Sequence, residues 1–536
     1  MRSLFLLCLL FLCTIFTIVP QLSAALVFPR AFFIDCGSSQ ETILGDLRWI
    51  PDDGFIKVGN KTTIQTPSLL PGLSSLRFFP DTSAIKYCYT LPVVRGARYL
   101  VRTTYFYGNF DGRGDPPVFN QIVEGTLWSV VNTTADYSQG LSTFYEIILA
   151  ATGKTLSVCL ARNQHTASSP FISALELVLL EQSLYNSTDF SKFALTTVSR
   201  HSFGHNGNMI SFPDDPFDRY WQPFMDNHPA VTSKSNVSVL DFWNKPPAQV
   251  FWTALGTEHP YETLQLQWPT VALPSSSYYI ALYFQDNREP APDHWRVFDI
   301  SVNVKTFYPN LNVSTSGVVV YANHWPLSAL TQIALTPAPG SKVGPLINAG
   351  EVFQIRELGG RTITRDVTAM HALARSLSNL PSDWNGDPCL PKGNSWTGVS
   401  CSEGKLVRVI SLSLTNFGIS GSLSPAIANL TALTTMTYSR SNILEDAGFP
   451  VSISDSSCCF SHFINVHYFI WQIVLISHLE DNQFSGSIPS SLADLDSLRE
   501  LFLQNNNLSG PVPDNLLRRP GLNLRLTPGN HFEGMG

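Results

Sequence analysis

Tyr99-Leu-Val-Arg-Thr-Thr-Tyr-Phe-Tyr107 is rich in β-branched and aromatic residues and predicts a β-strand. A shift of 179 residues places it on Tyr278-Tyr-Ile-Ala-Leu-Tyr-Phe284, and the same shift places Phe119 on Phe298. Farther along, Pro170-Phe-Ile-Ser-Ala-Leu-Glu176 matches Pro345-Leu-Ile-Asn-Ala-Gly-Glu351 at a shift of 175 residues. A period this long indicates a duplicated domain rather than a short solenoid unit.

Both halves of the duplication have the pattern of β structure. Each holds many short strand-like runs separated by Gly, Pro and Asn, which is typical of an antiparallel β-sandwich. We therefore expect two tandem sandwiches, copy 1 (26–185) and copy 2 (186–360). The 44% of apolar residues among 536 exclude bulk disorder. Only 14% of residues are charged and the net charge is −7, which argues against nucleic-acid binding because that needs a dense Lys and Arg surface.

The first residues predict secretion. A short basic start, an apolar run from Leu4 to Val19 and the small residues Ser23-Ala24-Ala25 indicate a signal peptide over residues 1–25. The next best apolar run, Phe463–Ile476, is too short for a membrane span, which needs about 20 residues. Sequons of the type N-x-S/T along the chain support a glycosylated, extracellular protein. Their asparagines are Asn60, Asn132, Asn186, Asn236, Asn312, Asn429 and Asn507.

Several motifs of copy 1 resemble the plant malectin-like extracellular domain. The resemblance extends from about Leu26 to Ile355 and implies two malectin folds, which are jelly-roll-like β-sandwiches related to carbohydrate-binding modules. It also implies work at the cell surface, in binding cell-wall glycans, secreted peptides or both. The motifs are Phe33-Ile-Asp-Cys-Gly37, Tyr87-Cys-Tyr-Thr-Leu-Pro92, Tyr105-Phe-Tyr-Gly-Asn-Phe-Asp-Gly112, Trp128-Ser-Val-Val131, Val158-Cys-Leu-Ala-Arg162 and Pro170-Phe-Ile-Ser-Ala-Leu-Glu-Leu177.

After residue 360 the apolar period changes to that of a helix, and Asp366 is placed to cap it. Trp384-Asn-Gly-Asp-Pro-Cys389 and Trp396-Thr-Gly-Val-Ser-Cys401 then resemble the N-terminal cap of plant leucine-rich repeats. This resemblance implies a disulfide between Cys389 and Cys401. We assign residues 361–405 to the helix and the cap. Of the remaining cysteines, Cys36, Cys88 and Cys159 are expected to form at most one bond, and the pair is left open.

The C-terminal part predicts a leucine-rich-repeat solenoid over residues 406–536. Leu479-Glu-Asp-Asn-Gln-Phe-Ser-Gly-Ser-Ile-Pro489 recurs 24 residues later as Leu503-Gln-Asn-Asn-Asn-Leu-Ser-Gly-Pro-Val-Pro513. Residues 436–478 break this frame and carry Cys458-Cys459. Two explanations stay open for this segment, a splice or gene-model artefact and a real insertion loop.

The candidate ligand residues follow from carbohydrate chemistry. Sugar sites combine aromatic rings, which cover the apolar face of the sugar, with carboxylates or amides that bind its hydroxyl groups. One strand-loop-strand unit in each copy supplies both kinds of side chain. The alternative is that Tyr105 and Tyr107, which alternation places on one face of a sheet, belong to the core. The candidates are Tyr105, Tyr107, Asn109, Asp111 and Phe119 in copy 1 and Tyr283, Gln285, Asp286 and Trp295 in copy 2.

No catalytic motif is complete. Gly153-Lys-Thr155 lacks the first glycine of a P-loop, and the sequence has no G-x-S-x-G, no H-E-x-x-H and no histidine cluster at metal-ligand spacing. We expect no enzyme activity, no cofactor and no metal. The predicted function is recognition of a cell-wall oligosaccharide or a secreted peptide at the cell wall or the outer face of the plasma membrane. A receptor kinase or another cell-surface protein is the expected partner. A secreted glycan-active enzyme and a purely structural wall protein are the alternatives.

Overall fold

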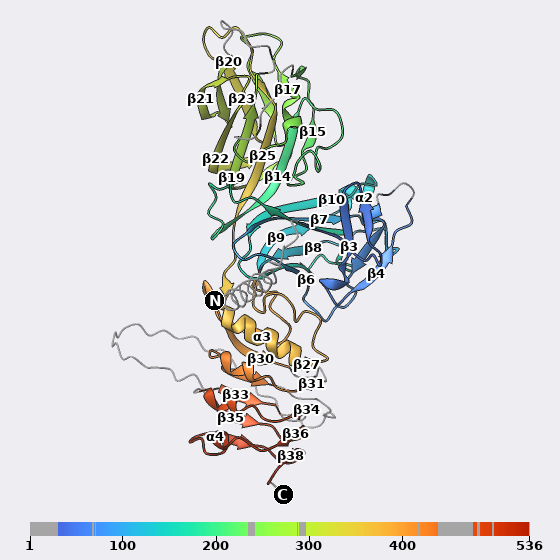
Figure 1. The fold of residues 1–536 in the computed structure, drawn as a ribbon, viewed down its shortest axis with the longest axis vertical. Helices are drawn as coiled ribbons and strands as arrows, with labels where there is room; N and C mark the ends of the chain where they lie inside the picture. Colours follow the sequence, from blue (N-terminus) through green and yellow to red (C-terminus); the bar gives the residue numbers. More distant parts are fainter. Residues whose placement is uncertain are drawn as a thin grey trace, which may run out of the picture.

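The computed structural model describes residues 31–66, 69, 71–233, 239, 242–286, 288, 296–414, 419–437, 475–479, 483–495 and 498–534. These residues form two β-sandwiches and a solenoid, stacked along the long axis of the molecule (Figure 1). Copy 1 lies in the middle, between copy 2 and the solenoid, so the order in space differs from the order in the sequence. The predicted fold class, mainly β with tandem sandwiches followed by capped repeats, is confirmed.

Copy 1 is built from two facing sheets and a small one. The first sheet has the order β2-β3-β1-β13-β7-β10, the second β6-β11-β8-β9 and the third β12-β5-β4. Apolar side chains of both larger sheets meet in one core, as the alternation in the sequence predicts. The bounds are β1 (Ala31–Asp35), β2 (Thr42–Leu44), β3 (Leu47–Pro51), β4 (Asn60–Thr63), β5 (Ser75–Phe78), β6 (Lys86–Pro92), β7 (Arg98–Tyr105), β8 (Phe119–Val123), β9 (Thr126–Val131), α2 (Thr134–Ser138), β10 (Thr143–Ala150), β11 (Thr155–Ala161), β12 (Phe171–Ile172) and β13 (Ala174–Leu180), with 3-10 turns η1 (Asp52–Gly54) and η2 (Pro71–Leu73).

Copy 2 repeats this plan, except that no strand of it corresponds to β2 in the described residues. Its sheets have the orders β14-β25-β19-β22, β18-β23-β20-β21 and β16-β17-β24, and β15 is added beside β14. The strand that holds Tyr99 in copy 1 corresponds to the strand that holds Tyr278 in copy 2, as the 179-residue shift predicts. The bounds are β14 (Phe193–Phe203), β15 (Gln222–Phe224), β16 (Ala230–Thr232), η3 (Ala248–Phe251), β17 (Thr253–Gly256), β18 (Leu264–Gln267), β19 (Leu273–Phe284), β20 (Arg296–Val302), β21 (Lys305–Val313), β22 (Val318–Ala329), β23 (Gln332–Pro337), β24 (Leu346–Ile347) and β25 (Ala349–Glu357).

The two sandwiches share one sheet. The edge strand β10 of copy 1 pairs antiparallel with β14 of copy 2 through Ile147↔Thr196 and Ile148↔Leu195. Within the described residues this pairing makes a continuous sheet of eleven strands. One apolar cluster on this sheet also contains side chains of both copies, among them Ile148 of copy 1 and Phe353 of copy 2. The relative position of the sandwiches is therefore fixed by main-chain hydrogen bonds and by a common core.

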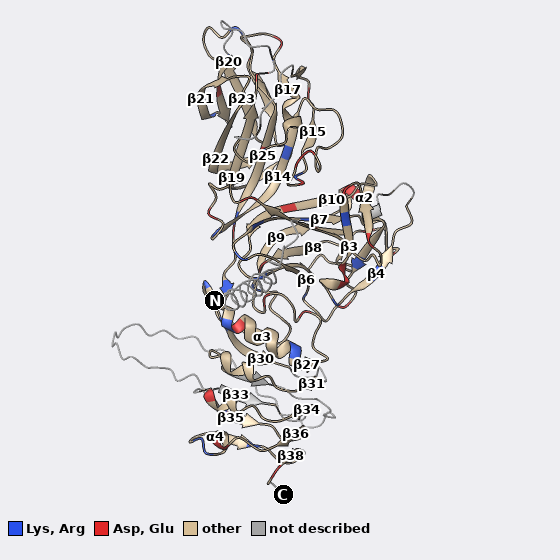
Figure 2. Cartoon of the chain, viewed as in Figure 1, with Lys and Arg blue, Asp and Glu red and all other residues tan. Residues whose placement is uncertain are grey.

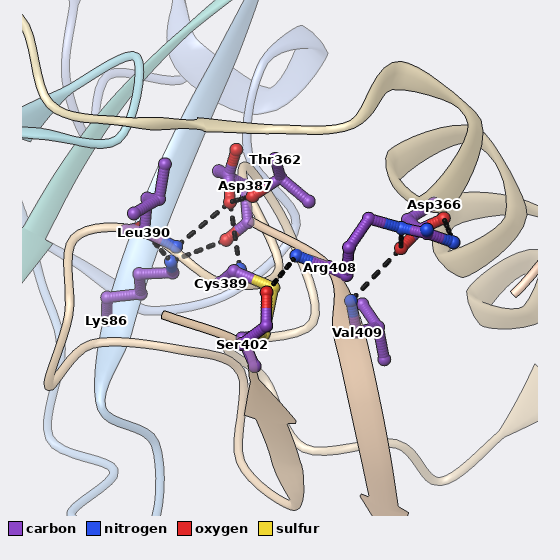
Figure 3. Close-up of a disulfide and its surroundings, with 10 residues drawn as sticks. Lys86, Thr362, Asp366, Asp387, Cys389, Leu390, Ser402, Arg408 and Val409 are labelled. Atoms are coloured by element: carbon purple, nitrogen blue, oxygen red, sulfur yellow. Dashed lines mark hydrogen bonds and ion pairs between the residues drawn. A yellow bond between two sulfur atoms is a disulfide. The ribbon is translucent and has the colours of Figure 1, made fainter. Parts of the chain in front are cut away.

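The cap begins with helix α3 (Thr364–Ser376), which buries Met370 and Leu373 against the first repeat. The expected cap residue, Asp366, lies inside the first turn instead and makes no capping bond. Its buried carboxylate accepts hydrogen bonds from Arg408 Nε at 2.8 Å and Val409 N at 3.0 Å, as Figure 3 shows. The capping prediction was wrong because the sequence gives no sign of Arg408, a partner 42 residues away.

The repeats stack as two ladders, one on each side of the solenoid, in which the first strand pair is antiparallel and the following pairs are parallel. The order is β28-β30-β32-β33-β35-β37 on one side and β27-β31-β34-β36-β38 on the other. Leucines of successive turns fill the space between them. The bounds are β26 (Arg361–Thr362), β27 (Leu377–Ser378), β28 (Val399–Cys401), β29 (Leu406–Val407), β30 (Val409–Ser413), β31 (Ser420–Gly421), η4 (Pro425–Asn429), β32 (Thr435–Thr437), β33 (Leu475–His478), β34 (Gln483–Gly486), η5 (Ser490–Asp494), β35 (Leu498–Phe502), β36 (Asn507–Gly510), α4 (Asp514–Leu517), β37 (Asn523–Arg525) and β38 (His531–Phe532).

Two disulfides lie in the described part of the chain. Cys88 is bonded to Cys159 across β6 and β11 of copy 1, and Cys389 is bonded to Cys401 in the cap. Cys36 is a buried free thiol. Among the described residues no helix has the length and apolar character needed to cross a membrane. The predicted signal peptide, most of the irregular segment 436–478, Asn236 and Trp295 lie outside the described residues.

Candidate functional site

In copy 1, the aromatic residues of the sequence-predicted ligand group are core residues. Tyr105 and Phe119 are fully buried, and their rings meet edge to face with centroids 5.7 Å apart. The Tyr105 hydroxyl donates a hydrogen bond to Gln121 Oε1 at 3.0 Å. Because neighbouring side chains surround these rings, neither offers an open face to a sugar in this structure.

The loop that follows β7 is organised around Asp111. Tyr107 is 1% exposed, and its hydroxyl donates a hydrogen bond to Asp111. Asp111 also accepts one from Ser168 Oγ at 2.6 Å. Asn109 is exposed and uses its Oδ1 to accept a hydrogen bond from Gly114 N at 2.7 Å. Asn109 and the half-buried Asp111 are thus the members of this group that reach the surface, and their contact with a sugar stays a prediction.

The described residues of the copy 2 group, Tyr283, Gln285 and Asp286, are also interior. The buried Tyr283 hydroxyl donates to Glu351 Oε2 at 2.6 Å. Gln285 is buried and donates from Nε2 to Thr315 O at 3.0 Å. Asp286 is paired with Arg288 at 2.6 Å. Contact of these residues with a sugar stays a prediction, and so does contact by Trp295, which lies outside the described residues.

The structure instead places a pocket where the two sandwiches meet. Its volume is about 280 Å³, and it is lined by residues from both copies. Copy 1 contributes residues from α2 and the start of β10, and copy 2 contributes residues from β14 and from the segment leading into β15. The lining includes Asp136, Ser142, Thr143, Phe144 and Glu146 of copy 1 and Thr197, Ser199, Arg200, Tyr220 and Gln222 of copy 2.

Two lining residues of the pocket, Glu146 and Arg200, belong to an ion network that joins the copies. Glu146 on β10 accepts from Arg102 Nε at 2.8 Å with one oxygen and from Arg200 Nη1 at 2.6 Å with the other. Arg200, which is on β14, also donates from Nε to Glu351 Oε1 at 2.8 Å. Arg102, on β7, is paired in addition with Glu176 and with Asp218 of copy 2. Figure 2 shows an acidic position on β10 and a basic position on β14 at this contact.

The surroundings of Glu146 and Glu176 shift the pKa values of these two carboxyl groups in opposite directions. Desolvation alone would raise the pKa of Glu146, but the guanidinium groups of Arg200 and Arg102 on either side outweigh it and hold the pKa below its usual range. Burial raises the pKa of Glu176 to about 8, and Arg102 only partly offsets that effect. Glu146 is therefore a fixed anion between two cations, whereas the pKa of Glu176 is raised because burial outweighs its pairing with Arg102.

Two aromatic rings form part of the pocket wall. Phe144 and Tyr220 meet edge to face with centroids 5.3 Å apart. The Arg102 guanidinium lies over the Tyr220 ring, which holds the ring in place from the side of copy 1. Hydroxyl and amide groups of Ser142, Thr143 and Gln222 stand around the same space. The arrangement provides hydrogen-bond donors and acceptors beside apolar ring surface.

Sequence reasoning missed this pocket, although one signal was present. Arg102 stands inside the strand that reveals the duplication, and Glu176 and Glu351 end the second repeated motif. A charge inside an apolar strand indicates a buried partner, because unpaired charges are very costly in a core. The sequence could therefore have indicated an ion network, but not that its members come from two sandwiches.

The predicted glycosylation sites lie at the surface of the described residues. The sequon asparagines within the described residues are all exposed, as glycan attachment requires. In the described part of the chain, no group of three or more His, Cys, Asp or Glu side chains could hold a metal ion.

The fold defines a tandem β-sandwich protein whose two sandwiches share a pocket and carry a disulfide-capped leucine-rich solenoid. The sequence matches the malectin-like domain family over residues 34–355, the leucine-rich-repeat N-terminal domain over 363–402 and a leucine-rich repeat over 497–518. The chain belongs to the malectin-like family, and its C-terminal part carries leucine-rich-repeat domains.

Relatives with known names agree with this assignment. The chain is 30% identical over 417 residues to a leucine-rich-repeat receptor-like serine/threonine-protein kinase of Arabidopsis thaliana, covering 75% of this chain and 47% of that protein. It is 30% identical over 499 residues to a probable receptor-like kinase of the same organism, covering 86% of this chain and 49% of that protein. The chain thus spans about half the length of the curated relatives it matches. Among solved structures, the ANX2 ectodomain of Arabidopsis thaliana shares the fold, with a TM-score of 0.51 at 18% identity over 61% of this chain and 96% of that one.

Proposed function

We propose that this chain is a non-catalytic recognition protein that acts outside the cell and binds a cell-wall oligosaccharide in the pocket between the sandwiches. The pocket carries the proposal, because it sets the ring pair of Phe144 and Tyr220 beside hydroxyl and amide groups. Aromatic surface with hydrogen-bonding groups around it is what sugar rings require. Extracellular action is supported by the predicted signal peptide and by the exposed sequon asparagines.

The size of the pocket indicates how much of a glycan it holds. A volume of about 280 Å³ lies just below the range for small-molecule sites, about 300–1,000 Å³. The pocket therefore suits a short part of a chain rather than a long polymer segment. With few buried contacts, the affinity of this site should be weak, about micromolar to millimolar or −8 to −4 kcal/mol.

The charge state of Glu146 supports binding without turnover. A glycosidase needs a carboxylic acid that donates a proton to the leaving oxygen, and such an acid has a raised pKa. Glu146 has a lowered pKa and uses both oxygens in ion pairs with arginines. As the fixed anion of this network, it is poorly suited to the role of proton donor.

A protein partner is a second part of the proposal. Solenoids present a long surface that suits protein contacts, and the curated relatives are receptor-like kinases. A secreted peptide or a cell-surface protein such as a receptor kinase would be contacted by the repeats. A purely structural wall protein would bind polymer but would have no such partner.

The test is a glycan array followed by calorimetry on the full chain. Phe144→Ala removes half of the ring pair and should weaken binding of the best wall oligosaccharide at least about tenfold. Trp252→Ala is the matched control, because this exposed ring of copy 2 is not part of the pocket lining. Asn109→Ala tests the surface-exposed part of the sequence-predicted group. If Asn109→Ala weakens binding and Phe144→Ala does not, the glycan site is that loop and not the pocket. If the folded wild-type chain ignores every wall glycan, the carbohydrate proposal is wrong.

A further inference from the structure

The loop of residues 382–390 of the cap, named the docking loop here, lies against copy 1 (Figures 1 and 3). It contacts copy 1 rather than copy 2, although copy 2 directly precedes the cap in the sequence. The contact thus joins parts of the chain that are about 300 residues apart. It bears on how the repeats are held relative to the sandwiches.

Hydrogen bonds run across this contact in both directions. Lys86 on β6 donates from Nζ to Asp387 O at 2.7 Å and to Leu390 O at 2.9 Å. Asn385 donates from Nδ2 to Cys88 O at 3.0 Å and accepts from Thr90 Oγ1 at 3.1 Å. The side chain of Lys86 is buried, so a charged group has been taken out of water to make this contact. Such a group is tolerated only where acceptors are placed for it.

The surfaces also fit closely where two glycines stand. A Cβ at Gly125 of copy 1 would lie 2.8 Å from Leu390 Cβ of the docking loop. A Cβ at Gly386 would lie 2.9 Å from Cys88 Sγ, so this glycine lets the loop rest directly on the Cys88–Cys159 disulfide. Because even one added Cβ atom would be too close at either glycine, the two surfaces leave no room for a layer of water between them.

The side chains of the Trp384–Cys389 motif divide between two tasks. Trp384 packs on Trp396 with centroids 5.1 Å apart, and Asp387 accepts from Cys389 N at 2.8 Å, so these side chains build the cap itself. The Asn385 side chain and the bare Cα of Gly386 face copy 1. A cap that only closed the solenoid would not need the second set.

The segment that connects copy 2 to the cap is also hydrogen-bonded to copy 1. Gly359 N donates to Thr126 Oγ1 at 2.9 Å, just before the cap begins. The segment between the end of β25 at Glu357 and the start of α3 at Thr364 is too short to reach around copy 1 freely. The docking loop therefore meets its own copy 1 and not that of another molecule.

We propose that copy 1 carries a docking surface for residues 382–390 of the cap, and that this contact holds the repeats at a fixed angle to the pocket between the sandwiches. Copy 1, the cap and the repeats then move as one rigid unit. The proposal is independent of what the pocket binds.

The test uses Lys86→Glu in the full chain. In the docked state a carboxylate at this position would face two carbonyl oxygens, whereas in an undocked state water would surround it. We expect a larger maximum dimension in small-angle X-ray scattering and about tenfold faster amide exchange in residues 359–363 and 382–390. Lys57→Glu is the matched control, because it makes the same charge change on an exposed residue of copy 1 and should behave as wild type.

A milder variant protects the test against misfolding. Ser382→Ala with Asn385→Ala removes the bonds to Asp81, Cys88 and Thr90 and leaves Trp384 and Asp387 in place. It should speed exchange in the same two segments, while Asn394→Ala, in the same cap, should not. If both docking variants scatter and exchange like wild type, the contact does not set the orientation and the proposal is wrong. Glycan binding by the docking variants should be unchanged, which separates this test from that of the pocket.

Discussion

The Arg102 guanidinium lies over the ring of Tyr220, with its Cζ 3.2 Å from the ring centroid. Arg102 is on β7 of copy 1, and Tyr220 precedes β15 of copy 2. The same guanidinium is paired with Glu146, Glu176 and Asp218. One side chain thus combines a cation–π contact with three ion pairs at the junction of the sandwiches.

Replacing Arg102 with alanine should strongly destabilise the sandwich pair. The change leaves Glu146 and Asp218 buried with fewer counter-charges, and breaking such a pair from one side costs about 3–5 kcal/mol. Urea unfolding followed by tryptophan fluorescence should show an earlier transition. The control is Arg48→Ala, which breaks an exposed ion pair with Glu41 and should change the midpoint little. Equal effects of the two variants would contradict the central role of Arg102.

His201 should make copy 2 less stable in acid. Burial lowers the pKa of His201 from 6.5 to about 4, so the folded protein binds the proton less readily than the unfolded chain does. Its stabilising contribution is therefore complete above pH 6.5 and is lost as the pH falls from 6.5 to about 4. By linkage the loss is about 3 kcal/mol.

The measurement for His201 is the melting temperature of the chain between pH 7 and pH 4. His201→Gln keeps a neutral acceptor for Trp268 Nε1, which donates to His201 Nδ1 at 3.0 Å, and should flatten the curve between pH 6.5 and 4. His259→Gln, at an exposed position of copy 2, should leave the curve as in wild type. A curve that His201→Gln does not alter would assign the acid sensitivity to other groups.

The Cys389–Cys401 disulfide should stabilise the cap and the first repeat more than it stabilises copy 2. It closes a short loop with a sequence separation of 12, and such a bond contributes about 3 kcal/mol on the chain-entropy model. Cys389→Ser with Cys401→Ser should raise amide exchange in the cap and the first repeat before it affects copy 2. Peptide mapping without reduction should recover this pair and Cys88–Cys159. Recovery of Cys389 and Cys401 as free thiols would contradict the assignment.

Asn506→Ala should loosen the last repeats. This buried side chain donates to Leu479 O at 2.8 Å and Leu503 O at 3.0 Å and accepts from Phe484 N at 3.1 Å. Loss of these three buried hydrogen bonds costs about 2–4 kcal/mol in total. Exchange in residues 483–510 should increase. Asn515→Ala, which removes one exposed hydrogen bond, is the control and should have little effect.

Much of the fold could be predicted from the sequence because duplication leaves a direct record. The strand at Tyr99 and its match at Tyr278 do occupy equivalent places in two equivalent sheets. The cap motif could also be predicted, since it depends on residues close together in the chain, and the repeats could be predicted from the 24-residue recurrence of their motif. Features that depend on residue spacing within a short segment can be predicted from the sequence, whereas pairings between distant segments cannot.

The candidate site was less predictable, for a physical reason. Alternation shows that Tyr105 and Tyr107 share a face of a strand but not which face a second sheet covers, and the structure buries both. The pocket depends on the pairing of β10 with β14, which brings Glu146 next to Arg200. Edge strands carry no sequence mark of the partner they will meet. The pairing of edge strands from two duplicated sheets can therefore be recognised only in the three-dimensional structure.

The placement of copy 1 between copy 2 and the repeats has a mechanical consequence. Tension between a ligand in the pocket and the C-terminal end would divide between the covalent segment after Glu357 and the docked loop on β6. The hydrogen bonds of Lys86 and Asn385 hold the docked loop on β6. They resist tension less than the main-chain hydrogen bonds of a paired β-strand. They would yield before either sandwich unravels. Under load the docking loop would then detach from copy 1 first. The molecule would become longer while both sandwiches, and the pocket between them, stay folded.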